Sequence, residues 1–424
     1  MESALVSCGG AVVNERVAPA GTVRAGLLAA VTGLVFAIGP ATVDFSLPAM
    51  PQIQASIGTP AGRVELTLTL LFASLAVTQI LFGAVADRFG RRIPLLASLA
   101  IYSVGALAAA LAPGLLALAL ARVVQAIGFG VAGVIVRCAV TDVCDERRTA
   151  AVFSIAVTIV SIASVVAPAI GGEVLTLWSW RAVFFGMSAF GFAIFIVAAA
   201  LLPETLPGER RVRSSFLSAF GTYRKLLGSV RFFVPAAIGG CAAAFQFAYN
   251  TGGPSTVIEH YGVSPARAGV LFSIVALSTA VASQANAVLL KWFAPEQLTR
   301  VAVRVSVISS LGIVISAFTG YGGVIGLIAS LLVLIATLGM IMGNTMAAAI
   351  SSAGAHAGAA SALVGVMQFV FGTLASMPIG LAHDASGKWL SLVLLLLAIV
   401  ALALDRWGRR SGALALARAG SGSS

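Results

Sequence analysis

Long apolar runs make up most of the chain, and short polar segments separate them. Twelve of these runs approach the length of about 20 residues that a helix needs to cross ~30 Å of hydrocarbon. The pattern therefore predicts an all-α integral membrane protein with twelve transmembrane helices. The predicted spans lie near residues 25–47, 64–86, 93–112, 114–136, 150–174, 180–202, 232–252, 266–290, 300–319, 322–345, 357–382 and 387–404.

One longer polar stretch, residues 203–231, divides the spans into two groups of six. The two halves also echo each other, since IGTPAGRVELTLTLLFASLAV at 57–77 resembles YGVSPARAGVLFSIVALSTAV at 261–281. Halves in the same orientation are typical of transporters built from parallel repeats, whose substrate site lies between the halves. The predicted units are a cytoplasmic N-terminal tail (1–24), a first six-helix bundle (25–202), a cytoplasmic linker (203–231), a second six-helix bundle (232–404) and a cytoplasmic tail (405–424).

Charged residues are rare and unevenly placed. They form 10% of the chain, against 59% hydrophobic residues, whereas a soluble domain carries about a quarter charged residues. Most of the 26 lysines and arginines fall on one side of the predicted spans, which is the positive-inside pattern of an inner-membrane protein. We therefore expect both termini in the cytoplasm. The net charge of +11 then indicates topology in a lipid bilayer, not a nucleic-acid partner. The residues on the other side are Arg63, Arg181, Arg267 and Lys388.

The stretch GAVADRFGRR, residues 83–92, places four charges and two glycines between two apolar runs. Its glycines allow a close helix approach and a tight turn. Its acid can pair with the neighbouring arginines or cap an adjoining helix. Membrane anchoring alone would need only the arginines, so we interpret the cluster as a latch between cytoplasmic helix ends. The residues of this predicted cytoplasmic gate are Gly83, Asp87, Arg88, Gly90, Arg91 and Arg92.

The same stretch closely resembles the signature loop of the major facilitator superfamily, Gly-x-Leu-Ala-Asp-Arg-x-Gly-Arg-Arg/Lys, from which only Val85 departs. Further segments resemble drug:proton antiporters of the bicyclomycin-resistance (Bcr/CflA) type within that superfamily. The resemblance covers residues 35–390 and implies a twelve-span proton-coupled drug transporter, but it specifies no substrate. The segments are VDFSLPAMPQI (43–53), RVVQAIGFG (122–130), APAIGG (167–172), WSWRAVFF (178–185) and AGAASALVGVMQFVFG (357–372).

The segment APAIGG resembles the antiporter motif of the fifth helix in that family. The resemblance implies a bend at Pro168, Gly171 and Gly172. Here Ser164 and Ala167 stand where the family motif usually has glycine. Because small residues preserve close packing, we expect the bend to persist with less flexibility.

Two charges, Asp44 and Arg122, lie inside otherwise apolar spans. A charge that faces lipid costs ~2.5–3.5 kcal/mol on insertion scales, so each should face the central cavity or a partner. Burial disfavours the ionised form of a carboxylate and a nearby arginine favours it, so Asp44 is a candidate proton carrier. Arg122 would tune Asp44, bind an anionic substrate or stabilise helix ends. The alternative for Asp44 is a helix-terminal acid that is hydrated from the outer side of the membrane. The alternative for Arg122 is a structural role, in which it donates hydrogen bonds to neighbouring carbonyl groups. We expect Glu65 and Glu173 at the membrane interface.

Polar side chains in the remaining spans are candidate substrate contacts, although such residues also tie helices together. The five in the predicted substrate cavity are Gln125, Gln246, Asn250, Asn344 and Gln368. Histidines and cysteines have no metal-ligand or disulfide spacing, and no nucleotide-binding loop occurs. We therefore expect no metal and no cofactor, with the proton gradient as the energy source.

These patterns predict a proton-coupled exporter of small, amphipathic, drug-like molecules that works by alternating access as a monomer. One alternative is a dedicated transporter of a single metabolite. Another is a membrane sensor that binds its ligand without moving it. A membrane-embedded enzyme is disfavoured because no nucleophile, base or metal ligands cluster at one membrane face.

Overall fold

The computed structural model describes residues 25–60, 62–81, 90–144, 146–206, 216–382 and 384–421. The elements of the first half are α1 (Ala25–Val43), the 3₁₀ segment η1 (Asp44–Ala49), α2 (Met50–Ile57), α3 (Glu65–Leu81), α5 (Arg92–Ala110), α6 (Leu115–Val143), α7 (Glu146–Leu177) and α8 (Trp180–Leu201). After α9 (Phe216–Leu227), the second half contains α10 (Val230–Pro254), the π-helical turn η3 (Ser255–His260), α11 (Pro265–Leu289), α12 (Pro295–Thr319), α13 (Gly323–Ser352), the short η4 (Gly354–His356), α14 (Ala357–Ala382) and α15 (Lys388–Ser421).

The helices coincide with the predicted spans. Eleven helices of the described residues are long and apolar enough to cross a membrane, and α3 is a shorter apolar helix. The span predicted at 64–86 extends past Leu81, where the description of the chain stops until Gly90. The all-α, membrane-spanning architecture predicted from the apolar runs is therefore confirmed.

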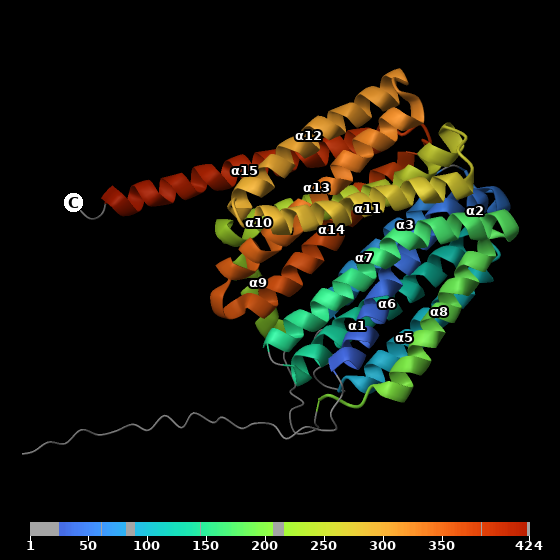
Figure 1. The fold of residues 1–424 in the computed structure, drawn as a ribbon, viewed down its shortest axis with the longest axis horizontal. Coiled ribbons are helices and arrows are strands. Elements are labelled where there is room, and N and C mark those ends of the chain that lie inside the picture. The colour runs from blue at the N-terminus through green and yellow to red at the C-terminus, as the bar shows by residue number, and fades with distance from the viewer. Residues whose placement is uncertain are drawn as a thin grey trace, which may run out of the picture.

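Two bundles lie side by side, with α1 to α8 in one and α10 to α15 in the other (Figure 1). Helix α7 packs against α11, and α3 packs against α14. The second span of each bundle thus contacts the fifth span of the other bundle. This reciprocal pairing is what two copies of one six-helix unit in the same orientation produce.

The two similar segments, residues 57–77 and 261–281, each contain the same kind of backbone turn. Gly58 follows α2 with φ of 69°, and Gly262 follows η3 with φ of 66°. Both angles lie in the left-handed region that glycine enters without a steric penalty. Each glycine lies shortly before the helix that contacts the other bundle, so the repeated sequence positions α3 and α11 equivalently.

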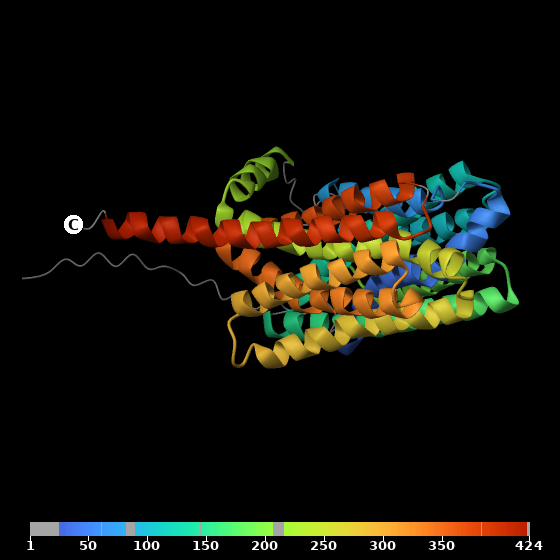
Figure 2. The same ribbon diagram turned by 90° about the horizontal axis from the view of Figure 1, so that it is seen from above.

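Two helical segments extend beyond the predicted spans. Helix α9 lies within the stretch expected as a linker, and Figure 2 shows it away from the long helices at one end of the bundles. Helix α15 runs past residue 404 to Ser421 and projects from the same end (Figures 1 and 2). Alanine, leucine and arginine favour helix in this extension. We call this end the linker end, and the opposite end, which carries η1, α2 and η3, the far end.

Glycines bring the two bundles into backbone contact near the far end. A Cβ atom on Gly172 of α7 would lie 2.6 Å from the backbone oxygen of Pro265 in α11. Reciprocally, Gly269 of α11 lies against the backbone oxygen of Pro168 in α7, and Gly171 lies against the backbone of Phe45 in η1. The residues of the predicted antiporter motif therefore lie where α7 meets its neighbours, and α7 is one continuous helix through Pro168.

The contact at Gly172 predicts the effect of adding one methyl group. Because the neighbour is backbone, Gly172→Ala should force α7 and α11 apart and destabilise the protein by about 1–3 kcal/mol. A matched control is Gly365→Ala on α14, where an added Cβ meets nothing within 4 Å. Thermal unfolding in detergent should show a lower midpoint for Gly172→Ala than for Gly365→Ala. Equal midpoints would contradict the close interbundle contact.

Candidate functional site

The first span changes conformation at Asp44, where α1 gives way to the 3₁₀ segment η1. Pro48 lies inside η1 and has no backbone N–H to donate to the preceding turn. The side chain of Ser46 also bonds the last turn of α1, since its hydroxyl donates to Thr42 O at 3.2 Å and to Val43 O at 2.9 Å. The proline and the serine together stabilise the change from α-helical to 3₁₀ geometry at the acid. We call this change the helix break.

Arg122 of α6 holds the same break from the neighbouring helix. Its guanidinium donates to Thr42 O at 3.0 Å and to the Ser46 hydroxyl at 2.8 Å. It also donates to Gln125 Oε1 at 3.2 Å and lies 4.8 Å from the ring centre of Phe184 in α8. The side chain is 0% exposed. These contacts match a structural hydrogen bonder that fixes the conformation on both sides of Asp44.

A second polar layer supports this arrangement. The Thr42 hydroxyl lies 3.0 Å from the Tyr102 hydroxyl of α5 and donates to Ile38 O at 2.6 Å. Tyr102 is fully buried, and Gly128 of α6 lies against its backbone. The helix break is therefore tied to α5 and α6, which makes it a rigid part of the first bundle.

Asp44 begins η1, which packs against α7 of its own bundle and against α10 and α11 of the second bundle. Its carboxylate accepts a hydrogen bond from the Ser164 side chain of α7 and interacts electrostatically with Tyr249 of α10. Asp44 and Arg122 form no ion pair, although both lie in the described part of the chain. Of the roles expected for Arg122, direct tuning through an ion pair with Asp44 is therefore not seen in this structure, and the guanidinium instead bonds groups beside the acid.

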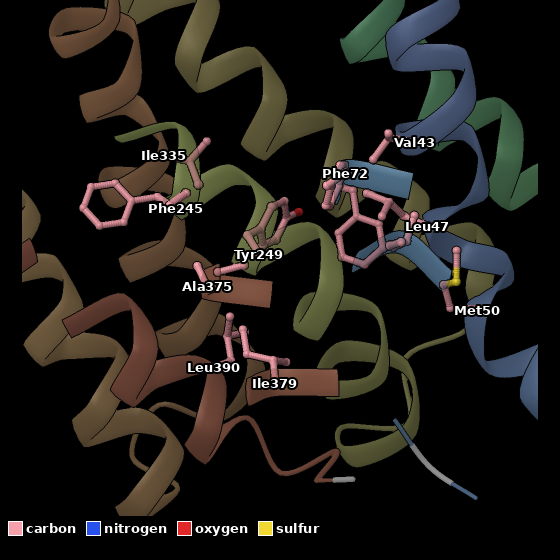
Figure 3. Packing of buried hydrophobic residues seen from close by; sticks show 14 of the residues in the cluster. Val43, Leu47, Met50, Phe72, Phe245, Tyr249, Ile335, Ala375, Ile379 and Leu390 are labelled. Carbon is pink, nitrogen blue, oxygen red and sulfur yellow. The ribbon is translucent and has the colours of Figure 1, made fainter. Parts of the chain in front are cut away.

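Tyr249 is the group that the second bundle contributes beside Asp44. It is 2% exposed, and its hydroxyl has no hydrogen-bond partner among the described residues. Figure 3 shows that this hydroxyl points towards the side of Phe72 and Leu47 in the first bundle. The ring packs edge-on against Phe272 of α11. A buried donor without a partner costs about 1–3 kcal/mol, so any acceptor that reached this hydroxyl would be stabilised by it.

Aromatic rings join the bundles next to this tyrosine. Phe247 of α10 stacks on Phe72 of α3 at 4.3 Å between ring centres and on Phe369 of α14 at 5.6 Å. Gly372 of α14 lies directly against the Phe247 ring. The stack therefore forms an apolar layer between the halves.

The polar residues expected in a substrate cavity fall into separate groups. The Gln246 side chain donates to Asn250 Oδ1 at 2.9 Å within α10. Asn344 of α13 exchanges two hydrogen bonds with Asn286 of α11, at 3.0 and 3.1 Å. Both pairs tie or stiffen helices, which is the alternative use expected for polar residues in membranes.

The other two residues of that set have sulfur neighbours. Gln125 accepts from Arg122 and lies 3.5 Å from the sulfur of Met187. Gln368 lies 4.0 Å from the sulfur of Met342. Thus only Gln125 belongs to the polar group around Asp44.

The described part of the signature loop joins three elements of the first bundle. Gly90 has φ of 84°, as expected for a tight turn. The Arg91 side chain forms an ion pair with Asp142 of α6 at 2.8 Å. The backbone N–H groups of Arg91 and Arg92 donate to the carboxylate of Glu204, which follows α8, at 2.8 and 3.3 Å. Asp142 and Glu204 were missed by the sequence reasoning, because their pairing depends on where three helix ends meet.

The remaining gate residues lie outside the described residues. They are Gly83, Asp87 and Arg88. The role of Asp87 in a latch therefore stays a prediction. No group of three or more histidine, cysteine, aspartate or glutamate side chains that could hold a metal ion occurs within the described ranges.

The chain belongs to the major facilitator superfamily, whose family model matches residues 32–377. It is a multi-pass membrane transporter, as the signature loop predicts, and not an enzyme. Its small-molecule substrate and its embedding in the bilayer follow from this membership.

Two curated relatives align along most of the chain. An uncharacterized transporter of this superfamily, YdgK of Bacillus subtilis (strain 168), is 31% identical over 356 residues, which cover 84% of this chain and 88% of that protein. The multidrug resistance protein MdtL of Shewanella oneidensis is 25% identical over 375 residues, covering 86% of this chain and 91% of that protein.

Solved structures share the fold. A bacterial homologue of the human lysosomal transporter Spinster, in an inward-facing and occupied conformation, superposes with a TM-score of 0.71 at 17% identity. The superposition covers 91% of this chain and 96% of that one. At this identity the likeness supports the twelve-span architecture alone.

Proposed function

We propose that the chain is a proton-coupled antiporter that exports small amphipathic molecules across the cytoplasmic membrane. It works as a monomer without a cofactor, and the proton gradient supplies the energy. The likeness to proteins named for multidrug resistance, at 25% identity, supports efflux of drug-like compounds.

The orientation follows from charge. Lysines and arginines concentrate in the predicted loops at the linker end, so this end and both termini face the cytoplasm. The far end then faces outwards. In this conformation the bundles touch near the far end through the contact of Gly172 with Pro265.

The observation that carries the proposal is the position of Asp44. The acid lies at a fixed helix break in one bundle and faces Tyr249 of the other bundle. When the bundles move, the surroundings of the carboxyl group change, and so must its affinity for a proton. A group whose proton affinity differs between two conformations couples proton binding to the conformational change.

The function is tested in inside-out membrane vesicles that contain the full chain. The lumen is acidified, and uptake of a panel of amphipathic cations, neutral drugs and common metabolites is measured with and without a protonophore. The proposal predicts uptake of several chemically different compounds that stops when the protonophore is added. A matched membrane without the protein sets the background.

Three other outcomes would each point to a different function or contradict the proposal. Uptake of one compound alone would indicate a dedicated metabolite transporter. Ligand binding by the purified protein without any uptake would indicate a sensor. Uptake that persists unchanged after the proton gradient is collapsed would contradict antiport.

A further inference from the structure

A second acid lies at the contact between the bundles, at the far end. Glu65 is the first residue of α3 and is only 3% exposed, whereas its sequence position predicts an interfacial residue. Ser255, at the start of η3, donates its hydroxyl hydrogen to Glu65 Oε1. Ser255 is also buried, at 7% exposed. The sequence does not reveal this burial, because it comes from the other bundle and not from periodicity along α3.

The packing around this contact depends on both bundles. Leu66, next along α3, lies against Gly380 of α14, where an added Cβ would be 2.7 Å from the leucine side chain. Ser255 continues directly from α10. Glu65 is therefore buried by α10 and α14 of the second bundle, and separating the bundles at the far end exposes it to water.

A small cavity beside the contact has a volume of about 10 Å³, which is at the lower limit for holding one water molecule. Two other carboxyl groups lie in the surroundings of Glu65. Asp384 lines the same cavity, and the exposed Glu259 of η3 interacts with Glu65 electrostatically. The cavity is lined by Gly62, Glu65, Thr251, Gly252, Ser255, Ile379, Asp384 and Ala385.

We propose that Glu65 is a proton-binding site at the far end, distinct from Asp44, and that its contact with Ser255 is made only while the far end is closed. Opening moves the carboxyl group from a buried interbundle hydrogen bond into water. The affinity of Glu65 for a proton therefore differs between the closed and open states. By linkage, proton binding from the outside then shifts the balance between those states. No bond other than that to the proton is formed or broken. The inference deepens the proposed antiport and rests on it for the direction of the gradient.

The test measures opening of the far end without any substrate. Ile379→Cys serves as the reporter in a chain whose four native cysteines are replaced, because Ile379 lines the cavity and is 5% exposed. Right-side-out vesicles are treated with a maleimide that does not cross membranes, at a series of outside pH values. Because a maleimide reacts with the thiolate form of cysteine, the intrinsic rate rises with pH. Each labelling rate is therefore divided by the rate of Tyr321→Cys, an exposed position between α12 and α13, in the same buffer. This normalised labelling rate, used in every comparison below, reports how often the far end opens.

The reporter with native Glu65 should change its labelling rate by about fivefold or more between acidic and alkaline buffer, as typical coupling energies give. Glu65→Gln keeps a hydrogen-bond acceptor but cannot titrate, so its rate should not vary with pH. Ser255→Ala removes the donor and keeps the acid, so its rate should be higher at every pH and still vary. Glu173→Gln, an exposed acid of α7 near the far end and outside this group, is the matched control and should behave like the unmodified reporter.

A pH dependence that survives unchanged in Glu65→Gln overturns the proposal, as does a native reporter whose labelling ignores pH. If Glu65→Gln fails to reach the membrane, Ser255→Ala tests the proposal instead. Unchanged labelling in Ser255→Ala would show that the contact between Ser255 and Glu65 does not hold the far end closed. Labelling needs no substrate and no gradient. If the labelling results contradict the proposal for Glu65, the vesicle uptake assay still tests antiport independently.

Discussion

Asp44→Asn is expected to abolish uptake driven by a pH gradient while leaving downhill exchange of substrate in place. The amide keeps the size of the side chain and can still interact with Ser164, so the helix break should persist. The group can no longer gain or lose a proton, so the conformational change loses its link to the gradient. Accumulation at an imposed pH gradient should fall by about tenfold or more.

The measurement compares two assays on the same inside-out vesicles. One follows accumulation with an acidified lumen, and the other follows exchange of labelled for unlabelled substrate with no gradient. Glu173→Gln is the matched control, because Glu173 is an exposed acid of α7 near the same end of the bundles. It should match the unmodified protein in both assays. Loss of exchange as well as accumulation in Asp44→Asn would indicate a substrate-binding role in place of proton coupling.

Arg122→Ala should produce the second large effect, on stability and transport together. The substitution removes donors to Thr42 O and the Ser46 hydroxyl inside a fully buried site. Hydrogen bonds to charged groups contribute about 1.5–3 kcal/mol each, so the destabilisation should reach about 3 kcal/mol or more. The helix break then loses the contact that fixes Asp44 relative to the second bundle.

Arg122→Lys tests whether the site needs the shape of the guanidinium group or only its positive charge. An ammonium group keeps the positive charge but lacks the planar fork that reaches two oxygens at once. We expect it to recover part of the thermal stability and little of the proton-driven uptake per folded molecule. Arg137→Ala on the same helix is the control, since Arg137 is exposed, donates a hydrogen bond to Gly133 O within α6, and otherwise lies 5.6 Å from the ring centre of Phe36, away from the helix break. A lysine variant with full uptake would show that charge alone suffices.

The positions of the spans and the repeat between the two halves could be predicted from the sequence. Apolar runs locate the helices because hydrocarbon thickness sets their length. The echo between residues 57–77 and 261–281 indicates the repeat, and the left-handed turns at Gly58 and Gly262 show its structural basis. These features are local, so one stretch of sequence contains all the information they need.

The partners of the buried charges could not be predicted in the same way. Arg122 bonds a carbonyl and a hydroxyl beside the helix break, and backbone groups carry no signal in a sequence. Arg91 pairs with Asp142, which lies on another helix. Such contacts depend on how helices rotate against one another, and very apolar spans leave that rotation weakly specified.

Glu65 illustrates the same limit at the bundle interface. The sequence places it early in a span, where an acid normally meets water or headgroups. Its burial arises because Ser255, far along the chain, closes over it from the second bundle. Only the relative placement of the two halves reveals that contact.

The most direct test of the central claim is substrate-induced proton release from the purified protein in weakly buffered detergent solution, followed with a pH indicator. The account predicts that a compound identified in the uptake panel displaces protons from the unmodified protein. It predicts no such release from Asp44→Asn, provided that the variant still binds the compound. Equal proton release from both proteins would contradict the assignment of the coupling proton to Asp44.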